Sequence, residues 1–403
     1  MNRLNCFPPT LAAAHARIRA IDADGYARTR NALDGSVTGL SPYFTHGFLT
    51  LPGALADIAA RNALNVQHKL VYELGWREYF RHVWRHKGDG IFDSLHQGLL
   101  ADNAYAHELP LDIREARTGV PVIDLAVRTL YSTGYLHNHV RMWLASYVVH
   151  LRKIHWRTGA DWMVAQLLDG DLASNHLSWQ WVAGSASRKP YLFNAENVAR
   201  FAPAPWHSPR TIIDLSYESL EAIARGSKSI AVDPLGEAMP EPILYQRPPG
   251  VSVFPMPEAG TIAQRDVWLV HPWSLRAPPS TLPSDTLLIG VCFADFHDRW
   301  PWSAARWAFV VPRMQELATY LWLGDAASLS AALSQARSVG AYADPHIDDI
   351  LCKVAARVTS APLFADVAEP CASFSAWWTR VTKDVEQLQD LSGLAALRGE
   401  PAR

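Results

Sequence analysis

The sequence predicts a multidomain protein in which an all-helical part is followed by a smaller α/β part with a parallel sheet. Three observations predict this. The chain has 403 residues, and domains usually contain about 100–200. The first 225 residues carry the apolar spacing of helices, whereas the residues after 266 alternate short apolar runs with helical segments. Residues 226–266 are rich in proline, which suits neither a helix nor a central strand.

The composition is that of a folded globular protein, with 49% hydrophobic and 19% charged residues. The formal net charge of −2 excludes a uniformly polybasic nucleic-acid-binding chain. Residues 1–225 nevertheless carry 23 Lys+Arg against 20 Asp+Glu, a net +3, and residues 226–403 carry 14 against 19, a net −5. The positive part permits a local basic patch. Tryptophan is unusually frequent, with 16 copies.

The N-terminus lacks the long apolar run of a signal peptide, and no stretch approaches the ~18 apolar residues of a membrane span. The four cysteines (Cys6, Cys292, Cys352 and Cys371) are scattered without a CxxC pair. This spacing predicts no disulfide framework and no zinc or iron–sulfur site. We therefore expect a cytoplasmic protein with no membrane partner and no bound metal.

Helical spacing in the first part predicts helices over 63–86, 120–134, 137–156 and 160–171. Gly134 is expected to cap the second, and Gly170 to end the fourth. The proline-rich stretch 226–266 is expected to run as an extended strap over the surface.

The second part is expected to alternate strands and helices. Strands are predicted over 267–272, 286–295, 320–325, 339–344 and 361–366, and helices from Ser303 onward, over 328–337 and over 347–358. Pro312 is expected to kink or break the first of these helices. No GxGxxG or GxxxxGK motif follows a strand, so the common phosphate-binding fingerprints are absent from the sequence.

Three predicted helix faces combine polar and aromatic side chains. They are Asn138, Arg141, Met142 and Ala145; Asp171, Asn175 and Trp179, if 171–181 is helical; and Glu73, Trp76, Arg77 and Phe80. The first and third sets recur at i, i+3, i+4 and i+7 and the second at i, i+4 and i+8, which places each set on one face. Buried polar groups need partners or a ligand. Facing one another, these stripes would suit a planar aromatic ligand with polar edges.

Four segments, 34–47, 73–82, 117–142 and 169–184, resemble the photolyase/cryptochrome family. The resemblance runs from about 26 to about 200 and covers the helical domain that binds FAD in this family. It implies that 1–225 is an all-helical FAD-binding domain, 226–266 a linker and 267–403 an α/β domain similar to the family's antenna domain. The family places the antenna domain first, so the resemblance implies a circularly permuted or domain-swapped order; the alternative is an unrelated flavodoxin-like domain.

The resemblance also implies which residues hold FAD. They are Tyr26, Thr38, Gly39, Leu40, Ser41, Arg77, Asn138, Arg141, Asp169, Asp171 and Asn175. Residues 38–41 match the segment at the pyrophosphate, where hydroxyls and free N–H groups before a helix suit an anion. Asp169 and Asp171 match the acidic pair beside the flavin ring and ribose, and Asn175 matches the residue facing flavin N5. No antenna pigment is assigned, because the charged motif usual after the first strand is missing.

For function, the resemblance implies light-driven repair of cyclobutane pyrimidine dimers in single-stranded or duplex DNA by electron transfer from reduced FAD. The residues implied at the reaction are Glu73, Trp76, Asn138, Met142, Asn175 and Trp181. Trp76 and Trp181 match the indoles that embrace the dimer; the alternative is that both belong to the core. Glu73 matches the carboxyl that hydrogen-bonds the bases. Such stacking contributes ~1–3 kcal/mol per base and offsets the cost of extruding the dimer.

Departures from the family pattern keep a second function open. Trp179 and Trp156 match two members of an electron-transfer chain, but Asn103 stands where the third indole is expected, with Tyr105 the nearest aromatic. His139 replaces a family arginine, and Lys189–Tyr191 replaces a longer segment beside the DNA-facing cavity. These departures favour a cryptochrome-like photosensor or a redox flavoprotein without repair. A flavin-free nucleic-acid-binding module is a third possibility.

Overall fold

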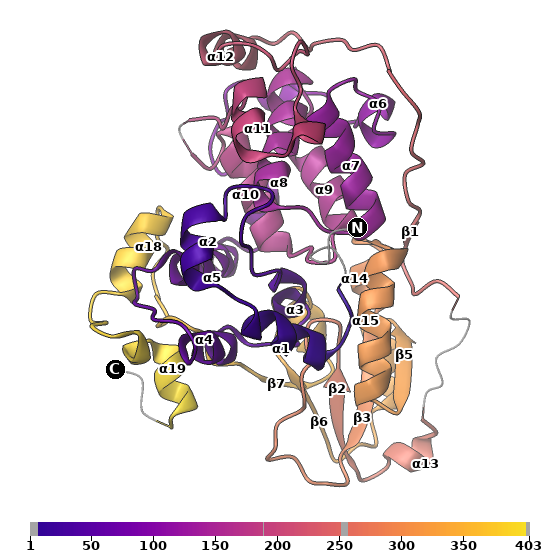
Figure 1. The fold of residues 1–403 in the computed structure, drawn as a ribbon. Helices are drawn as coiled ribbons and strands as arrows, with labels where there is room; N and C mark the ends of the chain where they lie inside the picture. The colour runs from indigo at the N-terminus through magenta and orange to yellow at the C-terminus, as the bar shows by residue number, and fades with distance from the viewer. Residues whose placement is uncertain (1–6, 188, 251–256, 400–403) are drawn as a thin grey trace.

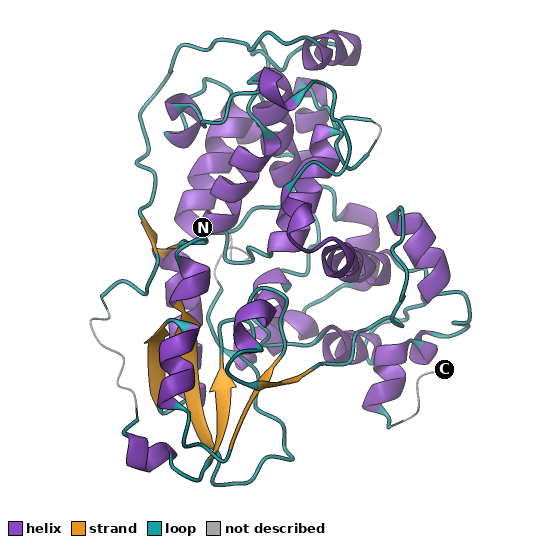
Figure 2. Ribbon diagram, turned by 180° about the vertical axis from the view of Figure 1, so that it is seen from behind, coloured by secondary structure: helices purple, strands orange, loops and turns teal. Residues whose placement is uncertain are grey.

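The structure, a computed structural model, describes residues 7–187, 189–250 and 257–399. Helices fill one end of the molecule, and a parallel sheet with its own helices forms the other (Figure 1). Seen from behind, the longer strands are confined to the sheet end, and a long loop descends one side to it (Figure 2). The predicted fold class, a helical part followed by an α/β part, is confirmed.

The helical part reaches to residue 225. Its helices are α1 (Leu11–Arg19), α2 (Ala23–Thr29), α3 (Ser41–Thr45), α4 (Leu51–Ala59), α5 (Lys69–Lys87), α6 (Leu111–Arg114), α7 (Pro121–Thr133), α8 (Asn138–Ser146), α9 (Trp156–Gln166), α10 (Leu172–Ala183), α11 (Ala195–Phe201) and α12 (Tyr217–Arg225). The prediction for α7 is confirmed, because proline begins it and Gly134 ends it with a left-handed φ of 65°. The helix predicted over 63–86 begins only at Lys69, where the His68 imidazole caps it.

The described residues of the second part form a five-stranded sheet in the order β5-β3-β2-β6-β7, and every pairing in it is parallel. The strands are β2 (Asp266–Val270), β3 (Leu287–Phe293), β5 (Tyr320–Gly324), β6 (Ser338–Tyr342) and β7 (Ala356–Val358). The accompanying helices are α13 (Ala259–Ile262), α14 (Ala294–His297), α15 (Ala304–Leu317), α16 (Ala326–Ala332), α17 (Asp348–Leu351), α18 (Phe374–Val381) and α19 (Ser392–Leu397). This is a doubly wound order, which reverses direction between β2 and β6.

The reversal between β2 and β6 matters for the site. In such sheets, the crevice outside the carboxyl ends of the strands at this point is where ligands and polar side chains gather. Val267 of β2 pairs with Val339 of β6, so both strands end at the same edge. The segment that follows β6 carries Asp344 and His346 toward the helical part.

The prediction of one continuous helix over 137–156 is wrong. Helix α8 ends at Ser146, a π-helical turn covers Tyr147–Leu151, and α9 begins at Trp156. Lys153 adopts a left-handed φ of 53°, and its ammonium donates to the last carbonyls of α12, Ile223 O at 2.8 Å and Ala224 O at 2.9 Å. These tertiary contacts outweigh the local helical pattern.

Two predictions in the α/β part are also wrong. The segment 347–358 is not one helix, because α17 stops at Leu351 and 356–358 is the edge strand β7. The segment 361–366 is not a strand, since the amides of Leu363 and Phe364 donate to the Glu78 carboxylate of α5 instead of to a ladder. Helix α15 runs through Pro312 without interruption.

The segment after α12 runs as a strap. Leu235 N donates to Arg117 O, and Leu244–Tyr245 (β1) pairs with Trp302–Ser303 (β4) in an antiparallel bridge. The predicted strap includes residues 251–256, and the predicted set of cysteines includes Cys6; these lie outside the described residues. The division of the chain at 225/226 and 266/267 into domains stays a prediction. Within the described ranges, no helix is both long and apolar enough to cross a membrane.

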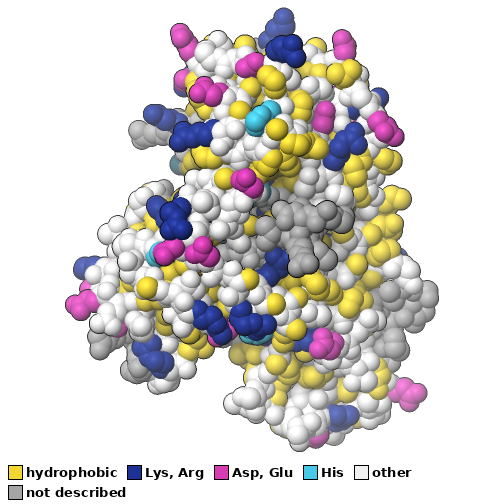
Figure 3. Space-filling model, viewed as in Figure 1, with side chains coloured by type: hydrophobic (Ala, Val, Ile, Leu, Met, Phe, Trp, Pro, Cys, Tyr) yellow, Lys and Arg dark blue, Asp and Glu magenta, His cyan; other side chains and the backbone are white. Residues whose placement is uncertain are grey.

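Buried side chains form two cores that cut across the sequence. One joins 7–92 and 164–177 to the α/β part, and the other lies within 109–220. The C-terminal helices pack on the N-terminal ones: α19 lies against α4 and α18 against α5 (Figure 1). On the face shown in Figure 3, Lys and Arg side chains are interspersed with Asp, Glu and apolar ones. This face therefore carries no single uninterrupted basic patch.

Candidate functional site

A cavity of about 350 Å³ lies in the helical part, and we call it the central cavity. This volume is within the range of small-molecule sites. Helices α2, α5, α8 and α10 and the loops 38–41 and 169–171 line it. The predicted residues that line it are Tyr26, Thr38, Gly39, Ser41, Glu73, Trp76, Arg77, Asn138, Arg141, Met142, Asp169, Asp171, Asn175 and Trp179. Leu40 is buried beside it, and neither Trp181 nor Trp156 lines it.

Asp169 holds two walls of the cavity together. Its carboxylate accepts a hydrogen bond from Ser41 Oγ at 2.5 Å, and the Arg141 guanidinium donates to both of its oxygens at 3.0 and 2.8 Å. Arg141 also donates from Nε to Leu136 O at 2.9 Å. The carboxylate therefore fixes the loop 38–41 against α8, through charge-assisted bonds of the stronger kind.

Asp171 caps α10 and carries the most shielded charge in the site. One of its oxygens accepts from Ser174 N at 2.8 Å, and the other lies 3.2 Å from Arg81 Nη2 and 3.6 Å from Arg77 Nη2. Burial alone would raise the pKa of this carboxyl, but the two guanidinium charges outweigh burial and hold the pKa well below its usual range. Asp171 is therefore a fixed negative charge at the cavity wall.

Asn175 lies one turn along the same helix, as its spacing predicted. Its amide N–H donates to Ala160 O of α9 at 2.9 Å, and its oxygen accepts no hydrogen bond from the described residues. This leaves an acceptor at the cavity. The Ser174 hydroxyl also lines the cavity, and it is buried without a partner among the described residues.

The other wall presents the residues predicted to meet a DNA lesion. Glu73 pairs with Arg30, Nε to Oε1 3.4 Å, and burial raises the pKa of this carboxyl. Asn138 Nδ2 lies 3.4 Å from Met142 Sδ. The Trp76 indole stacks on the Phe374 ring of α18, with centroids 4.0 Å apart and planes at 11°. One face of Trp76 is therefore already covered by the C-terminal helix.

Trp181 is the predicted site residue that stands apart. Its side chain is 40% exposed and tilts against Tyr191, with ring centroids 5.7 Å apart. The alternative that it is a core indole does not fit this exposure. Its ring is therefore accessible to solvent outside the lining of the central cavity.

The two predicted electron carriers are buried. Trp179 lines the cavity and packs on Gly159 of α9 so closely that a Cβ there would lie 2.3 Å from the indole. Trp156 donates from Nε1 to Ser94 Oγ at 2.9 Å. Beyond it the structure places His155 and then Tyr105, with ring centroids 5.6 and 6.1 Å apart in turn, whereas Asn103 is exposed.

Several residues at the site were not predicted from the sequence. Arg17 of α1 lies over Gly39, whose φ is +59° and whose missing Cβ would be 2.4 Å from the Arg17 guanidinium. Arg306 of α15 donates to Gly170 O at 2.8 Å, and burial lowers its pKa to about 9. The four-residue spacing from Arg77 could have revealed Arg81. Nothing local could have revealed Arg306, which is 136 residues from Gly170.

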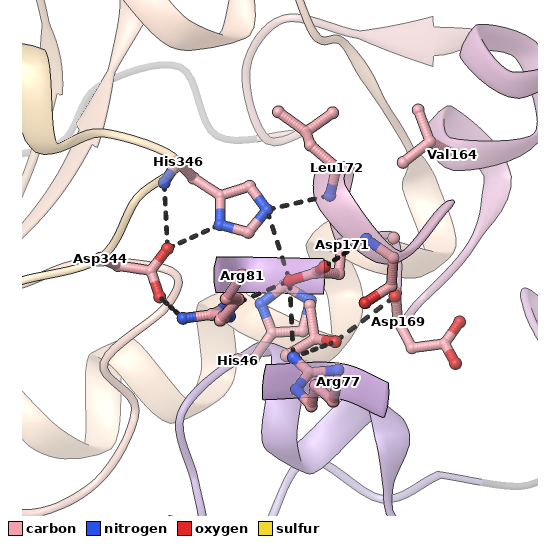
Figure 4. Close-up of polar contacts among 12 residues, drawn as sticks. His46, Arg77, Arg81, Val164, Asp169, Asp171, Leu172, Asp344 and His346 are labelled. Atoms are coloured by element: carbon pink, nitrogen blue, oxygen red, sulfur yellow. Dashed lines mark hydrogen bonds and ion pairs between the residues drawn. The ribbon is translucent and has the colours of Figure 1, made fainter. Parts of the chain in front are cut away.

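Asp344 and His346, from the segment after β6, were also missed. Asp344 lies 3.2 Å from Arg81 Nη1, and His346 Nε2 accepts from Leu172 N at 3.2 Å (Figure 4). The α/β part thus reaches the loop that carries Asp169 and Asp171.

Comparison with known proteins gives one family and a set of relatives. The family model described as the FAD binding domain of DNA photolyase matches residues 70–204. A deoxyribodipyrimidine photo-lyase of Synechococcus sp. is 31% identical over 225 residues, which are 52% of this chain and 45% of the relative. The photo-lyase of Escherichia coli is 39% identical over 132 residues, 30% of this chain and 27% of the relative.

A cryptochrome DASH of Idiomarina loihiensis is 31% identical over 211 residues, 50% of this chain and 47% of the relative. The solved structure of a cryptochrome from Synechocystis sp. is 28% identical, with a TM-score of 0.43, over 47% of this chain and 43% of that one. This chain therefore spans less than half the length of each of these relatives.

Proposed function

This chain belongs to the photolyase/cryptochrome family through its helical FAD-binding part, and from this premise we propose that it repairs cyclobutane pyrimidine dimers in DNA. The observation that carries the proposal is one shared cavity. Glu73, Trp76 and Met142 line the same space as Asp169 and Asn175. A lesion held by the first three would lie beside the cofactor wall formed by the last two.

The residues present fit FAD. Gly39 allows the backbone to pass under the Arg17 guanidinium, which supplies positive charge near a loop suited to phosphates. The Asn175 oxygen and the buried Ser174 hydroxyl offer hydrogen bonds that the described protein does not itself use. When bound and reduced, FAD would supply the light-driven electron. Within the proposal, residues 38–41 hold the pyrophosphate, and Asp169, Asp171 and Asn175 hold the ring and ribose.

This chain's own residues would hold the lesion. The raised pKa of Glu73 keeps a proton available for a hydrogen bond to a base over a wider pH range. Trp76 offers only the ring face that Phe374 leaves free. The exposed Trp181 ring would supply the second stacking surface. Extruding a dimer is least costly when it is unpaired, so we propose damaged DNA, single-stranded or duplex, as the partner.

The test is a repair assay on chemically reduced, illuminated protein with dimer-containing single-stranded and duplex oligonucleotides. We expect dimer loss with at least one substrate, and a reduction of about 5- to 150-fold in Trp181→Ala, the equivalent of ~1–3 kcal/mol of stacking. Trp206→Ala, a half-buried indole away from the cavity, is the matched control. No repair of either substrate by the wild-type protein contradicts the proposal.

A cryptochrome-like photosensor or redox flavoprotein without repair is the second candidate. The exposed Asn103, where the family pattern has an indole, and the position of Trp181 outside the central cavity favour it. This function predicts bound flavin that responds to light, together with oligonucleotides that stay damaged.

A further inference from the structure

A layer of charged side chains separates the central cavity from a second cavity of about 1210 Å³ that lies between the helical and α/β parts. Arg77 lines both cavities. Asp171 faces the central cavity, whereas Arg81, Asp344 and His346 face the second one. Figure 4 shows these side chains converging on one another from α5, from the N-terminal end of α10 and from the segment after β6.

The hydrogen bonds of His346 define its protonation. A backbone amide can only donate, so His346 Nε2, 3.2 Å from Leu172 N, must carry a lone pair. The proton therefore sits on Nδ1, which donates to Asp344 Oδ1 at 2.6 Å. The distance of 3.9 Å between Nε2 and Asp171 Oδ2 is too long for a hydrogen bond. His346 thus acts on Asp171 through the backbone of α10.

Asp344 also supports Asp171, through the guanidinium group of Arg81. Arg81 spans the two carboxylates, with Nη1 3.2 Å from Asp344 Oδ2 and Nη2 3.2 Å from Asp171 Oδ2. Burial would raise the pKa of Asp344, but the Arg81 charge and the hydrogen bond from His346 Nδ1 outweigh burial and hold the pKa well below its usual range. A charged Asp344 therefore fixes the guanidinium that holds Asp171.

The imidazole is itself held rigidly. The ring is buried and stacks on Trp273, with centroids 5.0 Å apart and planes at 14°, and Trp84 meets it edge-on at 5.1 Å. A residue whose rotamer is locked by packing can position a partner within a fraction of an ångström. Nε2 of the ring then fixes the first amide of α10, the helix that carries Asn175 at the cavity.

We propose that Asp344 and His346 are positioning residues for the flavin, so that the α/β part completes the FAD site of the helical part. The inference rests on the proposed function, because it assumes that FAD occupies the central cavity. It assigns the α/β part a role in holding the cofactor that needs no pigment of its own.

The test is the affinity for FAD, measured by titrating apoprotein, together with the absorption spectrum of the bound flavin and the thermal unfolding of the apoprotein. His346→Phe keeps the ring packing but removes both hydrogen bonds, and we expect FAD to bind at least about tenfold more weakly with a shifted spectrum. His346→Gln can restore an acceptor to Leu172 N, and we expect it to recover part of the affinity.

His271→Phe is the matched control. His271 is also buried and also lies against Trp273, but both of its hydrogen bonds, with Tyr342 O and Trp273 N, stay inside the α/β part. We expect this variant to lower the unfolding temperature without changing FAD affinity by more than about twofold.

Equal weakening in His271→Phe and His346→Phe, or an unchanged affinity in His346→Phe, would overturn the inference. If His346→Phe does not fold, Asp344→Asn keeps the shape and removes the charge, and it must weaken FAD binding for the inference to stand. A wild-type protein that binds no FAD contradicts the proposed function itself, which distinguishes the two failures.

Discussion

Asp171 shows how one carboxylate serves both the fold and the site. It caps α10, pairs with the partly buried guanidinium groups of Arg77 and Arg81, and lines the central cavity. Removing one partner of a buried ion pair is costly, because the remaining charge stays desolvated. Asparagine retains the shape and the capping ability of aspartate, so the exchange isolates the charge.

We predict that Asp171→Asn lowers the free energy of unfolding by about 3–5 kcal/mol. The matched exchange is Asp325→Asn, since Asp325 caps α16 through Ser328 N at 2.7 Å as Asp171 caps α10, but is fully exposed. That exchange should leave the free energy of unfolding nearly unchanged, because the charge of Asp325 is already solvated. Urea denaturation measures both, and equal losses would contradict the assignment of a buried ion network.

Residues near one another in the sequence were the predictable part of the site. The spacing of Asp171, Asn175 and Trp179 predicted that they would share one helix face, and all three line one cavity with Arg141. Arg81 and Asp344, by contrast, are 263 residues apart, and a pattern read along one helix carries no information about such a pair. Residues that line the cavity were therefore predictable from the sequence, whereas the contacts that support them were not.

Close packing of α9 on α10 fixes the orientation of the cavity-lining helix. These two helices approach where Gly159 faces the Trp179 indole, and a methyl group at residue 159 would lie 2.3 Å from Cη2. No left-handed φ requires glycine here. The residue is therefore needed for space, and the sequence pattern gave no sign of this.

At the element scale we predict that Gly159→Ala lowers the free energy of unfolding by about 1–3 kcal/mol through overpacking. Without a clash, alanine in a helix gains about 0.5–1 kcal/mol over glycine. Gly260→Ala in α13 is the control, because its Cβ would meet no atom within 4 Å, and it should be neutral or stabilising. Thermal unfolding of both variants tests this prediction. A Gly159→Ala variant that is more stable than the wild-type protein would contradict the close packing of α9 on α10.

Helix boundaries were predictable where a proline or a glycine in the sequence marks the end of the helix. Pro121 and Gly134 delimit α7 as expected. The break between α8 and α9 was not predictable, since it depends on Lys153 reaching α12 and on the buried pair of Arg152 and Asp112, at 2.5 and 3.0 Å. Boundaries set by tertiary contacts leave no local pattern.

Across the whole molecule, buried neutral histidines tie stability to pH. Burial lowers the pKa of His46 and of His297 to about 3 and that of His271 to about 4. Unfolded imidazoles take up protons near 6.5, so below that pH the unfolded chain binds more protons and the folded state loses stability. Glu78 has the opposite effect on stability. Burial raises its pKa to about 7, so the folded protein takes up a proton at Glu78 as the pH falls, and the folded state no longer holds a buried charge there.

We predict that the free energy of unfolding falls as the pH is lowered from 7.5 to 5. Each buried imidazole should lower it by roughly 2 kcal/mol, and protonation of Glu78 should offset the contribution of about one imidazole. Urea denaturation at the two pH values measures the difference. In His297→Phe, the change in the free energy of unfolding between the two pH values should be smaller by the contribution of about one imidazole. A stability that does not change over this interval would contradict the burial of these rings as neutral groups.

The two cores also show what the sequence could not give at this scale. Composition and proline content predicted a helical part, a strap and an α/β part, and the fold class is confirmed. Residues 7–92 nevertheless share a core with the sheet and with Trp377 and Trp378 of α18. Their partners lie about 300 residues away in the chain, so only the folded structure reveals that the two parts are interlocked.

The most direct test of the central claim, that the loops 38–41 and 169–171 and Asn175 form one FAD site, is equilibrium titration of the purified chain with FAD, followed by flavin fluorescence. We predict saturable binding of one FAD per chain, weakened at least about tenfold by Asp169→Asn, which removes the charge that pairs with Arg141. Absence of saturable binding to the wild-type chain, or affinity unaffected by Asp169→Asn, would contradict the account.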